Sequence, residues 1–156
     1  MKKMLTLFLP VLVLVIFFVI SFRNMHTYKQ KPRINHLALF VTDLKKSTDF
    51  YQQVIGLDTI PDPFRDGKHT WFSMGGKSQL HLIAGADSLP GQPKSHHLCF
   101  SVESTDGFIE NLEARSVAYE NWAGEANATT TRTDGVKQLW LQDPDGYWIE
   151  INDARD

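Results

Sequence analysis

The chain of 156 residues is long enough for one compact domain but too short for a second independent core. Its hydrophobic fraction of 42% and aromatic fraction of 12% exclude a predominantly disordered chain. The net charge of −2 conceals an asymmetry: residues 34–156 hold 10 Lys and Arg residues and all 18 acidic residues, a charge of −8 (10 − 18). Such an acidic domain argues against nucleic acid as a partner.

The first 22 residues are predicted to be an N-terminal signal anchor, that is, one transmembrane helix. Residues 4–22 carry no charged side chain, and as a helix they would span about 28 Å, enough to cross a bilayer. Lys2 and Lys3 precede this stretch, and no small-residue cleavage signal follows it. We therefore expect a single-pass membrane protein with an extracytoplasmic domain, joined by a basic linker at residues 23–33. Secretion after cleavage is the alternative.

From residue 34 onward the chain repeats itself, which predicts two modules at about 34–84 and 96–153. The segments NHLALFV, starting at Asn35, and HHLCFSV, starting at His96, align without a gap. In each module we expect a strand, a helix and then three short strands, bounded by Gly, Pro and Asp turns. The expected helices cover residues 43–55 and 106–115, and the expected strands cover residues 35–41, 57–60, 69–74, 79–83, 96–102, 117–121, 136–142 and 147–152.

Four side chains fall at equivalent places in the two modules. His36 and His97 lie in the first strands, while His81 and Glu150 lie in the last strands. Three imidazoles and one carboxylate suit a divalent first-row metal. The repeat therefore predicts one metal site, although a single histidine in an apolar run is more often a hydrogen-bonded core residue.

The period-two pattern of a strand places Glu150 on one face with Trp148 and Asn152. The pattern leaves open whether this face is the inner one, where an unpaired carboxylate would be costly. The lone cysteine, Cys99, lies in an apolar run, so we expect a buried, unreactive thiol.

A substrate pocket can be outlined from aromatic and basic side chains. Trp71, Phe72, Trp122 and Trp140 would supply aromatic surface, and Arg65 a cation for an acidic group. The aromatic residues are equally compatible with packing, and the cation with a solvated surface.

The chain resembles the vicinal oxygen chelate superfamily, which includes glyoxalase I, the bleomycin resistance proteins, fosfomycin resistance transferases and extradiol dioxygenases. The resemblance spans about residues 34–154. It rests on the motifs NHLAL from Asn35, DLKKSTDFY from Asp43, VIGL from Val54, HLCFSV from His97 and DPDGYWIE from Asp143.

The resemblance implies an α+β fold of paired βαβββ modules forming a cupped mixed sheet, one divalent metal (Zn, Ni, Mn or Fe) and frequently a homodimer. His36, His97 and Glu150 match three metal positions, and His81 stands where glyoxalase I carries a carboxylate. The activity implied is that of a metal-dependent lyase or isomerase that acts on a small oxygenated substrate, with Glu150 as the proton-transferring residue. An extradiol-type Fe(II) dioxygenase and a non-catalytic binding or resistance protein are the alternatives.

Overall fold

The structure is a computed structural model that describes residues 31–155. From Ile34 onward the chain forms one compact unit. The predicted anchor at residues 1–22 and most of the linker at residues 23–33 lie outside the described residues. Between residues 31 and 155, no helix is both long and apolar enough to cross a membrane.

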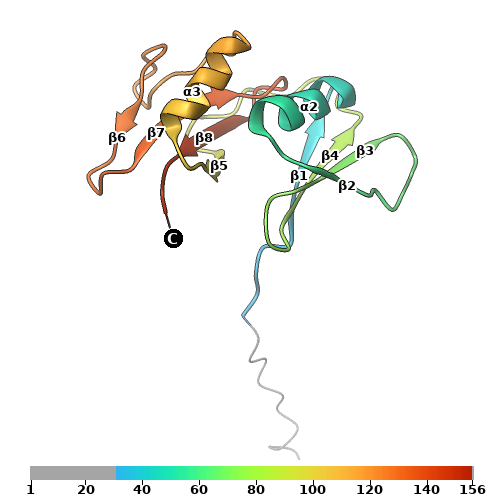
Figure 1. Ribbon diagram of the computed structural model, residues 1–156. Helices are drawn as coiled ribbons and strands as arrows, with labels where there is room; N and C mark the ends of the chain where they lie inside the picture. Colours follow the sequence, from blue (N-terminus) through green and yellow to red (C-terminus); the bar gives the residue numbers. More distant parts are fainter. Residues whose placement is uncertain (1–30, 156) are drawn as a thin grey trace, which may run out of the picture. The chain divides into compact units, whose positions relative to one another are not determined.

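The first half contains a four-stranded mixed sheet (Figure 1). β1 pairs in parallel with β4, and the remaining neighbours pair antiparallel. A parallel pair needs a crossover connection, which here includes the helical segment. The strands, in the order β1-β4-β3-β2, are β1 (His36–Val41), β4 (Gln79–Ala84), β3 (His69–Ser73) and β2 (Thr59–Ile60).

The helix predicted over residues 43–55 is confirmed, with a change of winding inside it. Asp43 caps the N-terminus of α2 (Leu44–Phe50) by accepting a hydrogen bond from the Lys46 backbone N–H. The chain continues as a π-helical segment, η1 (Tyr51–Ile55). Gly56 ends it with a φ of 86°, a left-handed conformation that suits glycine.

The second half repeats this arrangement, which confirms the predicted pair of βαβββ modules. Ser104 caps α3 (Thr105–Ala114) by accepting a hydrogen bond from the Gly107 N–H. The strands follow the order β5-β8-β7-β6, with β5 and β8 parallel. They are β5 (His97–Ser101), β8 (Trp148–Asn152), β7 (Lys137–Gln142) and β6 (Thr130–Thr131).

Two details differ from the sequence-based expectation. The strands form two four-stranded sheets instead of one continuous cupped sheet. In addition, residues 117–121 form no strand, and their pairing with β7 is limited to a bridge between Glu120 and Trp140. The Asn121 side chain then accepts from the Glu125 N–H at 2.9 Å, which turns the chain away and leaves β6 to pair with β7.

Strand alternation gives each sheet two distinct faces. Leu80 and Leu82 on β4, and Ile149 and Ile151 on β8, are fully buried in one hydrophobic core. Tyr51 of η1 and Leu112 of α3 belong to the same core. The intervening strand residues lie on the opposite side, which we call the ligand face. It carries His36, Trp71 and His81 on the first sheet and His97, Trp140 and Glu150 on the second.

The turn before β8 fastens the two halves together. The Asp145 carboxylate accepts hydrogen bonds from the Thr42 backbone N–H at 2.9 Å, the Thr42 hydroxyl at 2.6 Å and the Ser47 hydroxyl at 2.7 Å. Nearby, the Tyr51 hydroxyl donates to Asp143 at 2.9 Å. The predicted turn at residues 143–146 is therefore also a joint between the modules.

Candidate functional site

On the first sheet, the ligand face carries a stack of three rings. His81 on β4 lies opposite Trp71 on β3 in the strand register. Its ring stacks on the indole of Trp71, with centroids 3.7 Å apart and planes 12° from parallel. The His36 ring packs near-parallel to His81 at 4.5 Å. His81 is consequently held between two flat surfaces and is only 8% exposed.

This packing favours a neutral imidazole at His81. Burial, followed by the neighbouring His36 and His69, lowers the pKa of His81 below its ordinary value. Its Nε2 lies 2.9 Å from the Gln79 side-chain oxygen. Donation from Nε2 to this oxygen leaves Nδ1 with a free electron pair, the form in which histidine binds a metal.

On the second sheet, His97 and Glu150 form a direct pair. The His97 Nε2 lies 3.0 Å from the Glu150 Oε2, and Glu150 is only 8% exposed. The other carboxylate oxygen, Oε1, accepts from the Asn152 amide at 2.9 Å. The sequence left open on which face of the sheet Glu150 lies. The structure places it on the face opposite the core, where both of its carboxylate oxygens have a partner.

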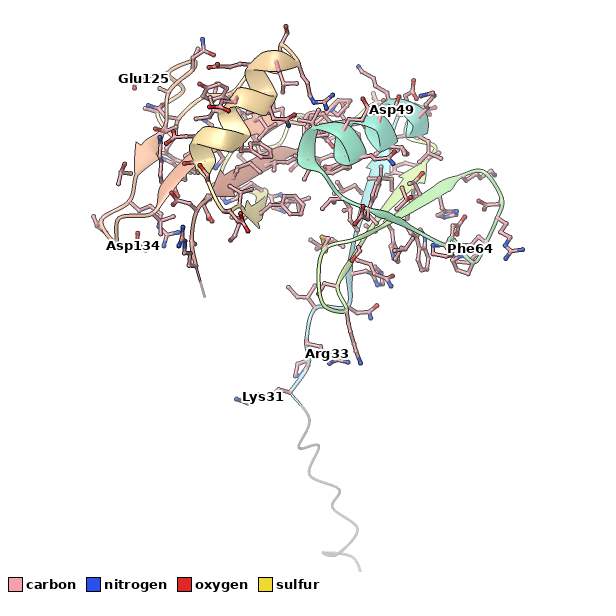
Figure 2. The ribbon with its side chains drawn as sticks, in the orientation of Figure 1. Lys31, Arg33, Asp49, Phe64, Glu125 and Asp134 are labelled. Carbon is pink, nitrogen blue, oxygen red and sulfur yellow. The ribbon has the colours of Figure 1, made fainter. Side chains whose placement is uncertain are left out.

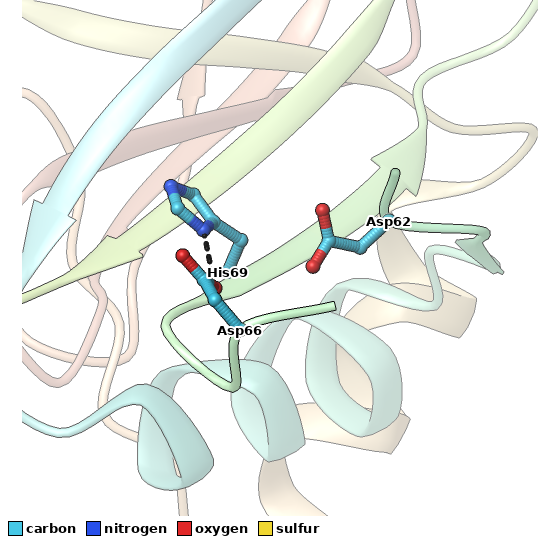
Figure 3. A group of neighbouring side chains, drawn as sticks. All are labelled: Asp62, Asp66 and His69. Carbon is cyan, nitrogen blue, oxygen red and sulfur yellow. Dashed lines mark hydrogen bonds and ion pairs between the residues drawn. The ribbon is translucent and has the colours of Figure 1, made fainter. Parts of the chain in front are cut away.

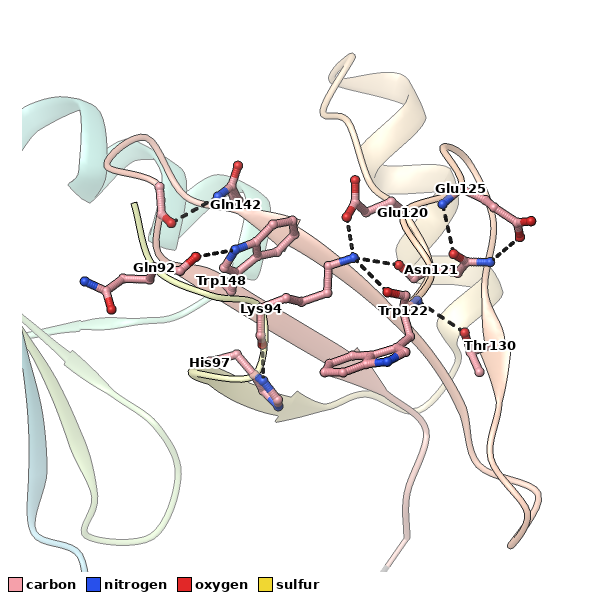
Figure 4. Close-up of polar contacts among 11 residues, drawn as sticks. Gln92, Lys94, His97, Glu120, Asn121, Trp122, Glu125, Thr130, Gln142 and Trp148 are labelled. Carbon is pink, nitrogen blue, oxygen red and sulfur yellow. Dashed lines mark hydrogen bonds and ion pairs between the residues drawn. The ribbon is translucent and has the colours of Figure 1, made fainter. Parts of the chain in front are cut away.

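A backbone carbonyl fixes the other nitrogen of His97. Its Nδ1 lies 2.7 Å from the Lys94 carbonyl oxygen (Figure 4). Because a carbonyl can only accept, Nδ1 carries a proton, and Nε2 is the nitrogen turned toward Glu150. Metal-bound histidines have this arrangement, in which the distal N–H donates to a carbonyl or carboxylate.

Cys99 lies beside this pair, opposite Glu150 in the register of β5 and β8. The sequence predicted a buried residue, but Cys99 is exposed at the edge of the sheet. Burial of the thiol itself, together with the Glu150 carboxylate, nevertheless raises the pKa of Cys99 to about 12. The thiol is therefore protonated near neutral pH, which supports the expectation of low reactivity.

The four predicted metal ligands thus form two pairs, His36 with His81 and His97 with Glu150. Among residues 31–155, no three of their ligand atoms lie mutually within 4.8 Å. The pairs occupy equivalent places on the two sheets, and the donor types suit a divalent ion. Each pair supplies two of the four predicted metal ligands.

One group of three possible metal ligands does come together in the described chain, and the sequence analysis missed it. Asp62, Asp66 and His69 lie around the β2–β3 loop (Figure 3). Asp62 also accepts from two loop N–H groups, while Asp66 accepts from the Lys68 N–H and contacts His69 Nδ1 at 2.9 Å. These hydrogen bonds stabilise the exposed loop, and this structural role is sufficient to explain why the three side chains lie together.

The predicted pocket residues are divided between the two faces. Trp71 and Trp140 lie on the ligand face, next to His81 and Glu150 respectively. Trp122 is 51% exposed and packs edge-on against Trp140 at 5.4 Å. Phe72, in contrast to the expectation, is fully buried in the hydrophobic core, because adjacent strand residues face opposite sides.

Arg65, the predicted cation of the pocket, lies in the β2–β3 loop with a φ of 52°. Its neighbour Phe64 projects from the same loop (Figure 2) and packs edge-on against Trp71 at 6.0 Å. The aromatic surface beside His81 therefore extends to Phe64, which the sequence analysis did not single out. Its position in a polar loop gave no signal.

Two βαβββ modules, one with a pair of imidazoles and the other with an imidazole–carboxylate pair on its ligand face, define a protein of the vicinal oxygen chelate class. The chain belongs to the Glyoxalase/Bleomycin resistance protein/Dioxygenase superfamily, whose sequence profile matches residues 33–151. This match confirms the resemblance recognised in the sequence motifs.

Several relatives share about a quarter of their residues with this chain. The "Lactoylglutathione lyase" of Pseudomonas aeruginosa is 26% identical, and the match covers 80% of this chain and 84% of the relative. "Glyoxylase I 4" of Arabidopsis thaliana is 28% identical over 76% of this chain and 68% of the relative. The uncharacterized protein YwbC of Bacillus subtilis is 26% identical, with coverages of 76% and 95%.

Solved structures share the fold. "Oxidase ChaP-H2" superposes with a TM-score of 0.67 at 18% identity, covering 81% of this chain and 96% of the other. A lactoylglutathione lyase from Agrobacterium tumefaciens gives a TM-score of 0.60 at 22% identity, with coverages of 80% and 95%. At these identities the likeness establishes the fold alone.

Proposed function

We propose that this protein is a divalent-metal-dependent lyase or isomerase of the glyoxalase type, acting on a small oxygenated substrate by proton transfer. The observation that carries the proposal is the His97–Glu150 pair, preset on a ligand face and matched by His36 and His81 on the other sheet. Zn, Ni, Mn and Fe are all compatible with three imidazoles and one carboxylate.

Glu150 is the residue proposed to move the proton. Asn152 and His97 each hold one of its oxygens, so the carboxylate has a fixed orientation in a nearly buried site. A bound metal would polarise a substrate carbonyl and acidify the neighbouring C–H bond. The carboxylate could then accept that proton and return it to an adjacent atom.

His81 restricts how the proton can move. Glyoxalase I resembles this chain but carries a carboxylate at the equivalent place. Here the side chain is an imidazole whose pKa is lowered by burial, so it is neutral at pH 7. It suits a metal ligand, and Glu150 remains the anionic base among the four proposed ligands.

We further propose that two copies of the chain complete each metal site. β1 and β5 are edge strands, and an apolar cleft of ≈240 Å³ lies between them. Two apolar residues at or beside β1, Ile34 and Phe40, are 67% and 46% exposed. A twofold dimer that covers this region would join the His36–His81 pair of one copy to the His97–Glu150 pair of the other, forming two identical sites.

Mixing two inactive variants tests both proposals. One variant carries His36→Ala and His81→Ala, and the other carries His97→Ala and Glu150→Ala. Each homodimer would contain only half-sites, whereas a mixed dimer would contain one intact site. Refolding equal amounts together should restore about one quarter of the wild-type metal content and lyase activity, since half of the dimers are mixed. No recovery would refute the shared site, and full metal retention by each variant alone would refute the ligand assignment.

An Fe(II) dioxygenase is the second candidate. His36, His97 and Glu150 provide the two histidines and one carboxylate of such centres, and the exposed Trp122 ring beside Trp140 would suit an aromatic substrate. Oxygen consumption with Fe(II) and a panel of catechols distinguishes it from the lyase, which consumes no oxygen.

We also propose that the uncharged residues 4–22 anchor the protein in a membrane, with the domain outside the cytoplasm. Digestion of intact spheroplasts by an added protease should then remove the domain. Protection of the domain would instead place it inside.

A further inference from the structure

We propose that Lys94 is a positioning residue for His97. Its ammonium group fixes the segment between the modules, and its own backbone carbonyl holds the His97 ring. The inference rests on the proposed function for the metal that His97 would bind. The ring orientation itself can be tested without a metal.

The first observation is the direct bond from His97 to this segment. The Lys94 carbonyl oxygen lies 2.7 Å from His97 Nδ1, and His97 Nε2 lies 3.0 Å from the Glu150 carboxylate. Both partners are acceptors, so the ring makes both contacts only when both of its nitrogens carry a proton. A metal would take the place of the Nε2 proton, and the bond from Nδ1 to the Lys94 carbonyl would then hold the ring with Nε2 toward the metal.

The second observation is the enclosure of the Lys94 ammonium group, which is drawn in Figure 4. It forms an ion pair with the Glu120 carboxylate and donates to the carbonyl oxygens of Asn121 at 2.9 Å and Trp122 at 3.2 Å. These three oxygens match the three N–H groups of an ammonium. The side chain is only 15% exposed.

Tryptophan rings add to this anchorage. The Lys94 Nζ lies 4.9 Å from the centre of the Trp148 ring, within the range of a cation–π interaction. The Trp148 indole N–H in turn donates to the Gln92 carbonyl at 3.0 Å. Gln92 and Lys94 are therefore tied to Trp148 of β8 and to residues 120–122, and one lysine supplies both the charged anchor and the carbonyl that contacts His97.

The test uses the purified full-length chain in detergent. Lys94→Met keeps the aliphatic stem and removes the charge. Glu120→Gln weakens the same anchor without changing the segment that contacts His97. Lys137→Met is the matched control, because Lys137 also pairs with an acid, Asp106, from the second half, but has no contact with His97. Two quantities are measured: the His97 tautomer, from imidazole ¹⁵N shifts followed to the neutral ring at alkaline pH without metal, and Zn²⁺ affinity by calorimetry.

In the wild type and in Lys137→Met, the proton of the neutral ring should be shared between Nδ1, which faces the Lys94 carbonyl, and Nε2, which faces Glu150. In Lys94→Met it should redistribute toward Nε2, and Zn²⁺ should bind about tenfold more weakly. Glu120→Gln should change both quantities in the same direction. A folded Lys94→Met variant with the wild-type tautomer and affinity would overturn the proposal.

If Lys94→Met fails to fold, Glu120→Gln decides, and unchanged ¹⁵N shifts in that variant would overturn the proposal. If the wild type binds no Zn²⁺, the metal site fails, while the tautomer in the metal-free protein still tests the role of Lys94. The two failures are therefore distinguishable.

Discussion

Replacing Asp145 with alanine should remove the hydrogen bonds that join the two modules and thereby lower the free energy of unfolding. The Ser47 hydroxyl is fully buried and donates to Asp145, so the substitution leaves a buried donor without an acceptor, at a cost of about 1–3 kcal/mol. The two hydrogen bonds from the exposed Thr42 can be replaced by water, and their loss costs about 0.5–1.5 kcal/mol. The free energy of unfolding should fall by about 3 kcal/mol at pH 7.

This loss should depend on pH. Burial alone would raise the pKa of Asp145, but hydrogen bonds from Thr42 and Ser47 outweigh it and lower the pKa below its ordinary value. A carboxyl group with a lowered pKa in the folded state stabilises the fold above the unfolded pKa of about 4, and this stabilisation is lost as pH falls through the folded pKa. The gap between wild type and Asp145→Ala should therefore be complete at pH 7 and should narrow below about pH 4.

Urea unfolding followed by far-UV circular dichroism measures the difference. Asp49→Ala is the control, because Asp49 forms only an exposed pair with Lys45 on α2 (Figure 2) and should change stability by less than about 0.5 kcal/mol. A loss at Asp145 no larger than at Asp49, or a gap that stays constant down to pH 3, would refute the role assigned to this turn.

Three further predictions concern the two faces of the sheets. With a pKa of about 12, Cys99 should react slowly with iodoacetamide at pH 8 despite its exposure, and Glu150→Gln should speed the reaction by removing a negative charge; an equal rate in both proteins would contradict this cause. Trp71→Ala should let water reach His81 and raise its pKa toward the ordinary value, measured by NMR titration, and a lower or unchanged pKa would exclude burial as the main cause. Phe72→Ala, one residue away but in the core, should lower the free energy of unfolding by about 3–5 kcal/mol, measured in urea; a loss under 1 kcal/mol would contradict its placement.

The sequence was sufficient to predict most of the fold. The repeat of NHLALFV as HHLCFSV located two modules, and both helices and the strands carrying the four proposed ligands follow from apolar periodicity and from the Gly56 stop. The expected strand at residues 117–121 was reduced to a bridge at Glu120. Its pairing depends on the turn that Asn121 makes with Glu125, which strand propensity does not reveal.

The site was only partly predictable. Strand alternation correctly grouped Trp148, Glu150 and Asn152, but no pattern indicated that Asn152 would hold the carboxylate. The same alternation should have separated Trp71 from Phe72, which were both assigned to a pocket. Lys94 could not be found from sequence, because its contacts with Glu120 and the Asn121 carbonyl bring together segments about 27 residues apart.

The positions of the tryptophan residues make their intrinsic fluorescence a probe of the ligand face. No indole belongs to the hydrophobic core cluster, although Trp140 is only 1% exposed, and Trp71 and Trp140 lie directly beside His81 and Glu150. Emission should therefore respond to ions and small molecules arriving at this side of the sheets while reporting little about core packing. Equilibrium titrations can accordingly be recorded on the unlabelled polypeptide.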